Sequence, residues 1–133
     1  MRVGLDTSVI LRLLTGEPAA QARSAWQAIV ETQSAGGKAV VSDMVVSEAY
    51  FALQHHYAVP KGEALAQLRA LFVSGDLVAA GCAAAVLATP GLAGAKPGFV
   101  DRMIHAEYVR DFDRMLTFEK AARKLPRTRL LQA

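Results

Sequence analysis

Short apolar runs alternate with helical patterns along almost the whole chain, and this alternation leaves few architectures open to it. The runs typical of buried strands lie at 2–6, 38–41, 77–80, 114–118 and 128–131. The segments with apolar residues at helical spacing lie at 7–14, 18–35, 42–57, 60–73, 99–110 and 119–125. Strands that alternate with helices are joined by right-handed crossovers and pair in parallel. The sequence therefore predicts the α/β class, with a three-layer α/β/α architecture around a central parallel sheet.

The composition agrees with one folded domain over residues 1–133. Hydrophobic residues make up 53% of the chain, which is enough for a sizeable core. The single cysteine, Cys82, excludes an internal disulfide framework and a thiolate zinc cluster. Asp6 and Arg12 interrupt the first apolar stretch, which does not fit a signal peptide, and no segment has the ~18 apolar residues that a membrane span needs. We therefore expect a cytoplasmic protein without a membrane segment.

An acid interrupts the apolar opening MRVGLDTSVILRLL. Asp6 lies at the carboxyl end of the first predicted strand, and an ionised carboxylate among apolar residues is costly unless it is paired, hydrogen-bonded or bound to a metal. The alternative is that Asp6 caps the helix that follows. Because the hydroxyls of Thr7 and Ser8 can supply that cap, we expect Asp6 to bind a metal ion.

Three further acids occupy equivalent places in the predicted topology. Glu48 and Asp101 lie in the early turns of helices that begin at the same edge of the sheet, and Glu119 follows the strand at 114–118. Ligands of parallel sheets gather at the carboxyl ends of the strands. Carboxylates brought together there repel one another unless a cation lies between them, and Mg²⁺ or Mn²⁺ suits oxygen ligands. Such an ion activates water for attack on a phosphodiester.

The end of the chain is basic. From position 120 onwards it carries no acid and five cationic residues, Lys120, Arg123, Lys124, Arg127 and Arg129. This charge suits contacts with the phosphates of a polyanion such as RNA, although a solvated helix face has the same composition.

Four segments resemble the PIN domain, in particular the ribonuclease toxins of the VapC family. They are LDTSVILRLL, SDMVVSEAYFAL, GFVDRMIHAEY and MLTFEKAARKL, in the order and spacing of that family over nearly the whole chain. The resemblance implies an endoribonuclease that uses Mg²⁺ or Mn²⁺, forms a homodimer and is held inactive by a cognate antitoxin. It also implies that Asp6, Glu48 and Asp101 are the core metal ligands. Glu119 then assists catalysis, while Thr7, Ser8 and Thr117 are hydroxyl positions that support the site.

Two residues depart from the family pattern. The family usually has TFD where this chain has TFE, so Glu119 carries its carboxylate one methylene further from the backbone. Arg102 stands beside Asp101, where it could pair with Asp101 or Asp113 or contact a substrate phosphate. These departures keep open an alternative function, a non-catalytic RNA-binding or regulatory domain. A phosphatase of the haloacid dehalogenase type is set aside, because Ser8 stands where that chemistry needs a second aspartate.

His105 lies one helical turn after Asp101, a spacing that can bind a transition metal. No second histidine stands in register with it. We therefore expect His105 to be a packed or surface residue and not a metal ligand.

Overall fold

The computed structural model describes residues 1–132 and has an α/β fold. Its strands are β1 (Arg2–Gly4), β2 (Lys38–Val41), β3 (Leu77–Ala79), β4 (Met115–Thr117) and β5 (Thr128–Leu130). Its α-helices are α1 (Thr7–Thr15), α2 (Ala19–Ser34), α3 (Asp43–His55), α4 (Lys61–Val73), α5 (Ala83–Leu87) and α6 (Phe99–Asp111). Two short 3₁₀ helices, η1 (Leu92–Gly94) and η2 (Lys120–Lys124), complete the described elements. The predicted fold class is confirmed.

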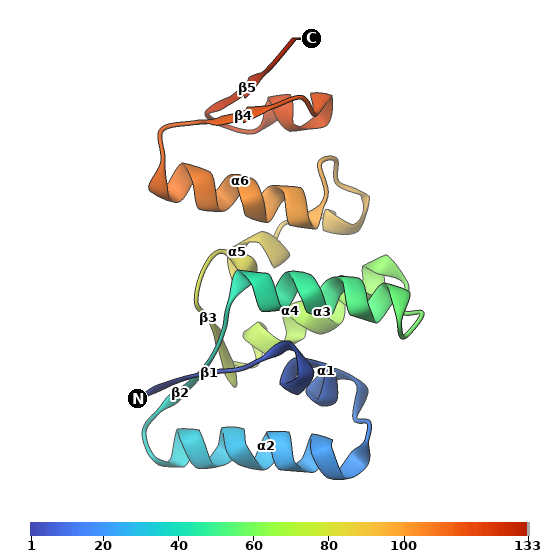
Figure 1. Cartoon of the computed structure of the whole chain (residues 1–133), viewed down its shortest axis with the longest axis vertical. Helices are drawn as coiled ribbons and strands as arrows, with labels where there is room; N and C mark the ends of the chain where they lie inside the picture. Colours follow the sequence, from blue (N-terminus) through green and yellow to red (C-terminus); the bar gives the residue numbers. More distant parts are fainter. Residues whose placement is uncertain (133) are drawn as a thin grey trace.

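The central sheet consists of three parallel strands in the order β1-β2-β3. β2 pairs with β1 through Val3↔Ala39 and with β3 through Val40↔Val78. α2 covers one face of this sheet, and α3 and α4 lie on the other face (Figure 1). This arrangement gives the three layers that the strand and helix pattern predicts.

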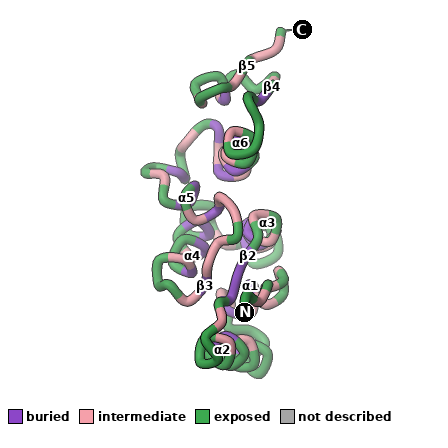
Figure 2. The backbone as a smooth tube through the Cα atoms, turned by 90° about the vertical axis from the view of Figure 1, so that its left-hand side faces the viewer, coloured by how far each residue is buried: buried purple, intermediate pink, exposed green. Residues whose placement is uncertain are grey.

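The last two strands form a separate sheet. β4 and β5 pair in parallel through Leu116↔Arg129, at the far end of the molecule from β1 (Figure 1). α6 lies between the two sheets in both views (Figures 1 and 2). The strands are therefore parallel, as predicted, but they divide between two sheets.

The core lies between the central sheet and the helices on both of its faces (Figure 2). Its largest fully buried side chains are those of Ile10, Ile29, Leu53, Leu68, Leu77, Val41 and Val46. α4 buries Leu65, Leu68 and Leu71 along one stripe, as its helical spacing predicts. The apolar spacing of α2 predicts that Ala22, Ala25, Trp26, Ile29 and Val30 share one core face. Only Ala22 and Ile29 are buried, while Trp26 and Val30 stay exposed, so this prediction is wrong in part.

The helix ends explain how the loops at the sheet edge are fixed. Serine is a favoured helix N-cap, and Ser42 caps α3, since its Oγ accepts a hydrogen bond from the Val45 amide at 3.2 Å. The Asp43 carboxylate accepts hydrogen bonds from the amides of Cys82 (3.0 Å) and Ala83 (2.9 Å). A Cβ at Gly81 would lie 2.5 Å from Asp43 Oδ2. The loop before α3 and the loop before α5 are therefore held together by one carboxylate, and glycine is required beside it.

Within residues 1–132, no helix combines the length and the apolar character needed to cross a membrane.

Candidate functional site

One threonine connects two of the predicted site acids. Asp6 follows β1, and its Oδ1 accepts a hydrogen bond from the Thr7 amide at 2.8 Å. The Thr7 hydroxyl donates to Glu48 Oε1, also at 2.8 Å, across 41 positions of sequence. Glu48 lies in the second turn of α3, which begins just after β2. The structure therefore links Thr7, the neighbour of Asp6, with Glu48 at the carboxyl ends of two adjacent parallel strands.

The environment of Asp6 differs from the sequence prediction. Its side chain is exposed, not enclosed by the apolar residues around it. Asp6, and not Thr7 or Ser8, is the N-cap of α1, where a carboxylate is also stabilised by the helix dipole. Ser8 lies near the carboxylate, with its Oγ 3.5 Å from Asp6 Oδ2. Exposure and one hydrogen-bonded oxygen therefore compensate the charge, and Asp6 stays accessible from solvent.

Asp101 lies in the first turn of α6, as predicted, and is exposed. Phe99, just before it, packs edge-on against Tyr50 of α3, with the ring centroids 5.1 Å apart. This contact seats the start of α6 on α3. Arg102 Nε donates to the carbonyl oxygen of Pro97 at 2.7 Å, so Arg102 fixes the loop before its own helix. The ion pair found in the described residues is Arg110–Asp111, which does not involve Arg102.

Thr117 is the last residue of β4 in the second sheet, and Glu119 follows it as the N-cap residue of η2. The Glu119 amide donates to Thr117 Oγ1 at 3.0 Å, which fixes the turn after β4, and the Glu119 side chain is exposed. Among the described residues no group of three or more acids, histidines or cysteines is close enough to hold a metal ion. Asp101 and Glu119 therefore do not join Asp6 and Glu48 in one cluster.

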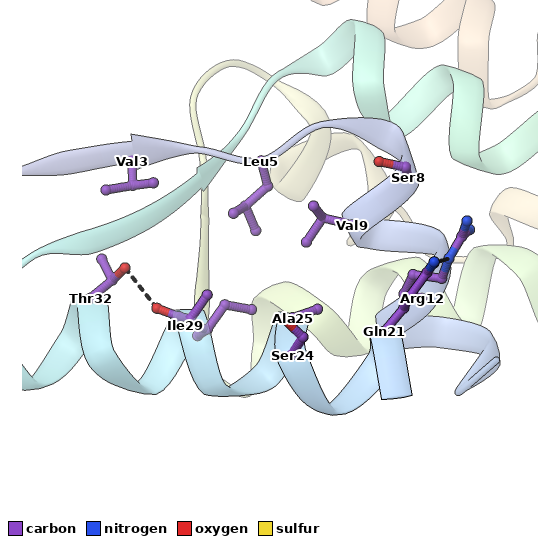
Figure 3. A pocket seen from close by; sticks show the side chains of 11 residues that line it. Val3, Leu5, Ser8, Val9, Arg12, Gln21, Ser24, Ala25, Ile29 and Thr32 are labelled. Carbon is purple, nitrogen blue, oxygen red and sulfur yellow. Dashed lines mark hydrogen bonds between the residues drawn. The ribbon is translucent and has the colours of Figure 1, made fainter. Parts of the chain in front are cut away.

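An apolar groove runs along β1 beside the candidate site (Figure 3). It lies between β1 and α1 on one side and α2 on the other, with a volume of about 360 Å³. Its apolar lining includes Val3, Leu5, Val9, Ala25 and Ile29. Arg12 and Gln21 close one end of it through a 2.6 Å hydrogen bond from Arg12 Nε to Gln21 Oε1.

The basic residues of the last segment do not form one uniform surface. Lys120, Arg123 and Lys124 line a hollow of about 450 Å³ together with Lys96. The sequence did not predict Lys96 as part of the basic surface, because hydrophobic periodicity does not indicate where a glycine- and proline-rich loop lies in the fold. Arg127 has a structural role, since its guanidinium donates to the backbone carbonyls of Val109 and Phe112. Lys96, Lys120, Arg123 and Lys124 therefore form the basic hollow, and Arg129 is exposed on β5.

His105 and Cys82 lie in surroundings that favour a structural role over a catalytic one. His105 is buried, and its Nε2 donates to the carbonyl oxygen of Pro126 at 2.7 Å, so the prediction of a packed residue is confirmed. Burial raises the pKa of the Cys82 thiol, and the nearby Asp43 carboxylate raises it further. Cys82 is therefore less easily deprotonated than an ordinary thiol, which does not suit a nucleophile.

Comparison with known proteins adds no identification, since no family model, no curated protein and no solved structure matches this chain.

Proposed function

We propose that the protein is a metal-dependent endoribonuclease of the PIN-domain type, related to the VapC toxins of toxin–antitoxin pairs. The observation that carries the proposal is the 2.8 Å hydrogen bond by which Thr7 holds Glu48 next to the segment of Asp6. It joins two of the acids whose motifs resemble the family. Their exposed oxygens have the chemistry that Mg²⁺ and Mn²⁺ prefer.

The proposal assigns different tasks to the acids. Asp6 and Glu48 are ligands of the ion, and Asp101 is the third ligand. Glu119 positions the attacking water. No group of three or more metal-binding side chains is found within residues 1–132, so the proposal requires Asp101 and Glu119 to approach Asp6 and Glu48 when the ion binds.

RNA binding is assigned to the basic hollow. Lys96, Lys120, Arg123 and Lys124 present their cations on one exposed surface, and cations that contact phosphates release condensed counterions. We therefore expect RNA affinity to fall as salt rises, without strong dependence on base sequence. A cytoplasmic location and control by a cognate antitoxin belong to the same proposal.

The direct test is cleavage of total cellular RNA by the purified protein with Mn²⁺, with Mg²⁺ and with a chelator. The critical variant is Asp6→Asn, because asparagine caps a helix about as well as aspartate and should leave α1 intact. Glu31→Gln, an exposed acid on α2, is the matched control. We expect discrete fragments that need the metal, that the Glu31→Gln protein still produces and that the folded Asp6→Asn protein does not. Cleavage that survives Asp6→Asn would refute the assignment.

A non-catalytic RNA-binding or regulatory domain is the second candidate. It is favoured by the absence, within residues 1–132, of a group of three metal-binding side chains. Calorimetric titration with Mn²⁺ separates the two functions. A nuclease should bind the ion and lose that binding in Glu48→Gln, whereas a binding domain should bind RNA with no measurable effect of metal or chelator.

A further inference from the structure

The second sheet has one covered face and one exposed face. Aligned residues of paired strands project to the same face, and successive residues along a strand alternate between the two faces. Met115 is aligned with Thr128; Met115 is buried and Thr128 is half-buried. Leu116 and Arg129, the next aligned pair, therefore face the other way, and both are exposed. The sheet thus packs against the rest of the described chain through one face and leaves the other to solvent.

The exposed face combines apolar and cationic side chains. The Leu131 amide donates to the Thr117 carbonyl at 2.7 Å, so the pairing of the strands continues past the end of β4. The alternation along the strand then places Phe118 on the same face as Leu116. Leu116 is 56% and Phe118 67% exposed, and Arg129 lies beside Leu116. Exposed apolar surface next to charge is typical of a binding surface.

A hollow lies at the carboxyl end of this sheet. Its volume is about 630 Å³, which is within the range of sites that hold small molecules. Three apolar side chains, two cations and one amide line it: Phe118, Leu130, Leu131, Lys120, Arg123 and Gln132. We call it the Phe118 hollow. Since Lys120 and Arg123 also line the basic hollow, an apolar site and a cationic site share these two side chains.

The charge of this part of the molecule favours an anionic partner. Between positions 112 and 132 the sequence carries six cationic residues and only two acids, Asp113 and Glu119. The ion pair found in the described residues, Arg110–Asp111, involves none of these six cations. The excess of positive charge is therefore not neutralised by ion pairs within residues 1–132, and it attracts a polyanion.

An anion that also covers Phe118 must carry apolar, planar groups close to its charges. Duplex RNA does not, because its bases are paired and it presents mainly phosphates and hydroxyls. Single-stranded RNA does, since its unstacked bases stack on aromatic rings while its phosphates contact lysine and arginine. An acidic polypeptide carries both kinds of group only in a particular sequence, whereas every nucleotide carries both. The exposed ring and the adjoining cations therefore favour single-stranded RNA.

We propose that the Phe118 hollow binds an unpaired base of single-stranded RNA. The base stacks on the ring of Phe118 beside Leu130 and Leu131, and Lys120 and Arg123 contact the neighbouring phosphates. The strand then continues into the basic hollow, which shares these two cations. The inference rests on the RNA binding of the proposed function and adds to it a selection for unpaired RNA. Because every base has a ring face, the hollow has little preference among bases.

The first experiment measures RNA affinity by fluorescence anisotropy, with a chelator present so that no RNA is cleaved. The probes are a short labelled RNA without self-complementarity and the same strand in a duplex. We expect the wild-type protein to bind the single strand more tightly. Phe118→Leu keeps an apolar side chain and removes the ring, so it should weaken single-strand binding about 5- to 100-fold and leave duplex binding unchanged. Phe118→Trp, which keeps a ring, should retain single-strand binding.

Phe112→Leu is the matched control. Phe112 is 61% exposed, close to the exposure of Phe118, and it does not line the hollow. Its variant should bind both probes like the wild type. Since both rings are exposed, both variants should fold, as circular dichroism can verify. Equal single-strand affinity of Phe118→Leu and wild type would overturn the proposal, and so would equal affinity of the wild type for the two probes.

The salt dependence of binding separates stacking from a disturbed cationic surface. Stacking releases no counterions, so the slope of affinity against salt should be the same for Phe118→Leu and wild type. Lys120→Ala removes a phosphate contact and should make that slope shallower. A shallower slope in Phe118→Leu would mean that the substitution acts by displacing the cations and would refute a direct contact with a base.

A second experiment observes the contact itself. Trp26, on α2, is the only tryptophan of the chain. In a Trp26→Phe chain, Phe118→Trp therefore places the single tryptophan at the hollow. We expect single-stranded RNA to quench its fluorescence, because a stacked base lies against the ring, while the fluorescence of Trp26 in the wild type stays unchanged. No quenching at saturating RNA would refute the stacking. Tighter binding of polyglutamate than of RNA would identify an acidic polypeptide as the partner and would refute it as well.

Neither experiment requires cleavage. Metal-dependent fragments test the nuclease, whereas binding in a chelator tests the hollow, so the two can fail separately. A protein that cleaves RNA and binds it equally well with and without the Phe118 ring would keep the proposed function and lose this inference.

Discussion

At the scale of single residues, the hydroxyl of Thr7 has the contact that matters most for the proposed site. It connects the segment after β1 with α3 through one hydrogen bond to Glu48. Glu48 is exposed and on a long side chain, so without this bond it would adopt many rotamers. In the proposed site Thr7 is therefore a positioning residue, since it acts on the ion through Glu48.

Thr7→Val tests this role, because valine keeps the shape of threonine and removes the hydroxyl. We expect RNA cleavage to fall about 10- to 100-fold, as is typical when a residue that orients a metal ligand is lost. The change in unfolding free energy should stay at about 1 kcal/mol or less, because the bond is exposed. Thr32→Val, which removes a bond within α2, is the control and should cleave normally. Equal rates for Thr7→Val and wild type would contradict the role of Thr7.

Cys82 supports a prediction about pH. Burial and the Asp43 carboxylate both raise the pKa of its thiol, so the reactive thiolate forms only at a higher pH than in an ordinary cysteine. The rate of alkylation by iodoacetamide, followed against pH, should rise with a midpoint above that of a small free thiol. Asp43→Asn removes a negative charge and should move the midpoint down. A midpoint at or below that of the free thiol would show that Cys82 is not shielded in this way.

At the scale of helices and strands, the contacts between loops decide stability. Asp43 bridges from the start of α3 to the start of α5, and Gly81 leaves the room for its carboxylate. Sequence patterns predicted the bounds of nearly every element, because burial periodicity and caps such as Ser42 are local signals. They did not predict the buried face of α2, since only the packing partner decides which apolar flank is covered. The segment at 119–125 contains the short 3₁₀ helix η2, where a terminal helix was expected.

Gly81→Ala tests the bridge between the two loops. Its Cβ would lie 2.5 Å from Asp43 Oδ2, so the carboxylate must move and the amides of Cys82 and Ala83 lose their acceptor. We expect a loss of about 1–3 kcal/mol in unfolding free energy, measured with urea. Gly94→Ala is the matched control, since a Cβ there meets no atom within 4 Å, and it should change stability by well under this amount. Similar losses in both variants would contradict the bridge.

At the scale of the whole molecule, the division of the strands between two sheets determines where the four candidate acids lie. Asp6 and Glu48 each follow a strand of the same sheet, and the hydrogen bond from Thr7 to Glu48 joins the two segments. The sequence predicts that Asp101 and Glu119 converge on the same place, whereas the described residues contain no group of three or more such side chains. Which strands become neighbours depends on long-range pairing, and no local pattern in residues 114–118 specifies their partner.

The open edge of β1 has a consequence for protein concentration. Among the described residues only β2 pairs with β1, so a strand of another molecule would meet unpaired backbone N–H and C=O groups on the outer side of β1. Pairing of two copies through this edge would grow with the square of the protein concentration for as long as most of the protein is monomeric. Doubling a dilute sample would then quadruple the amount of the paired form.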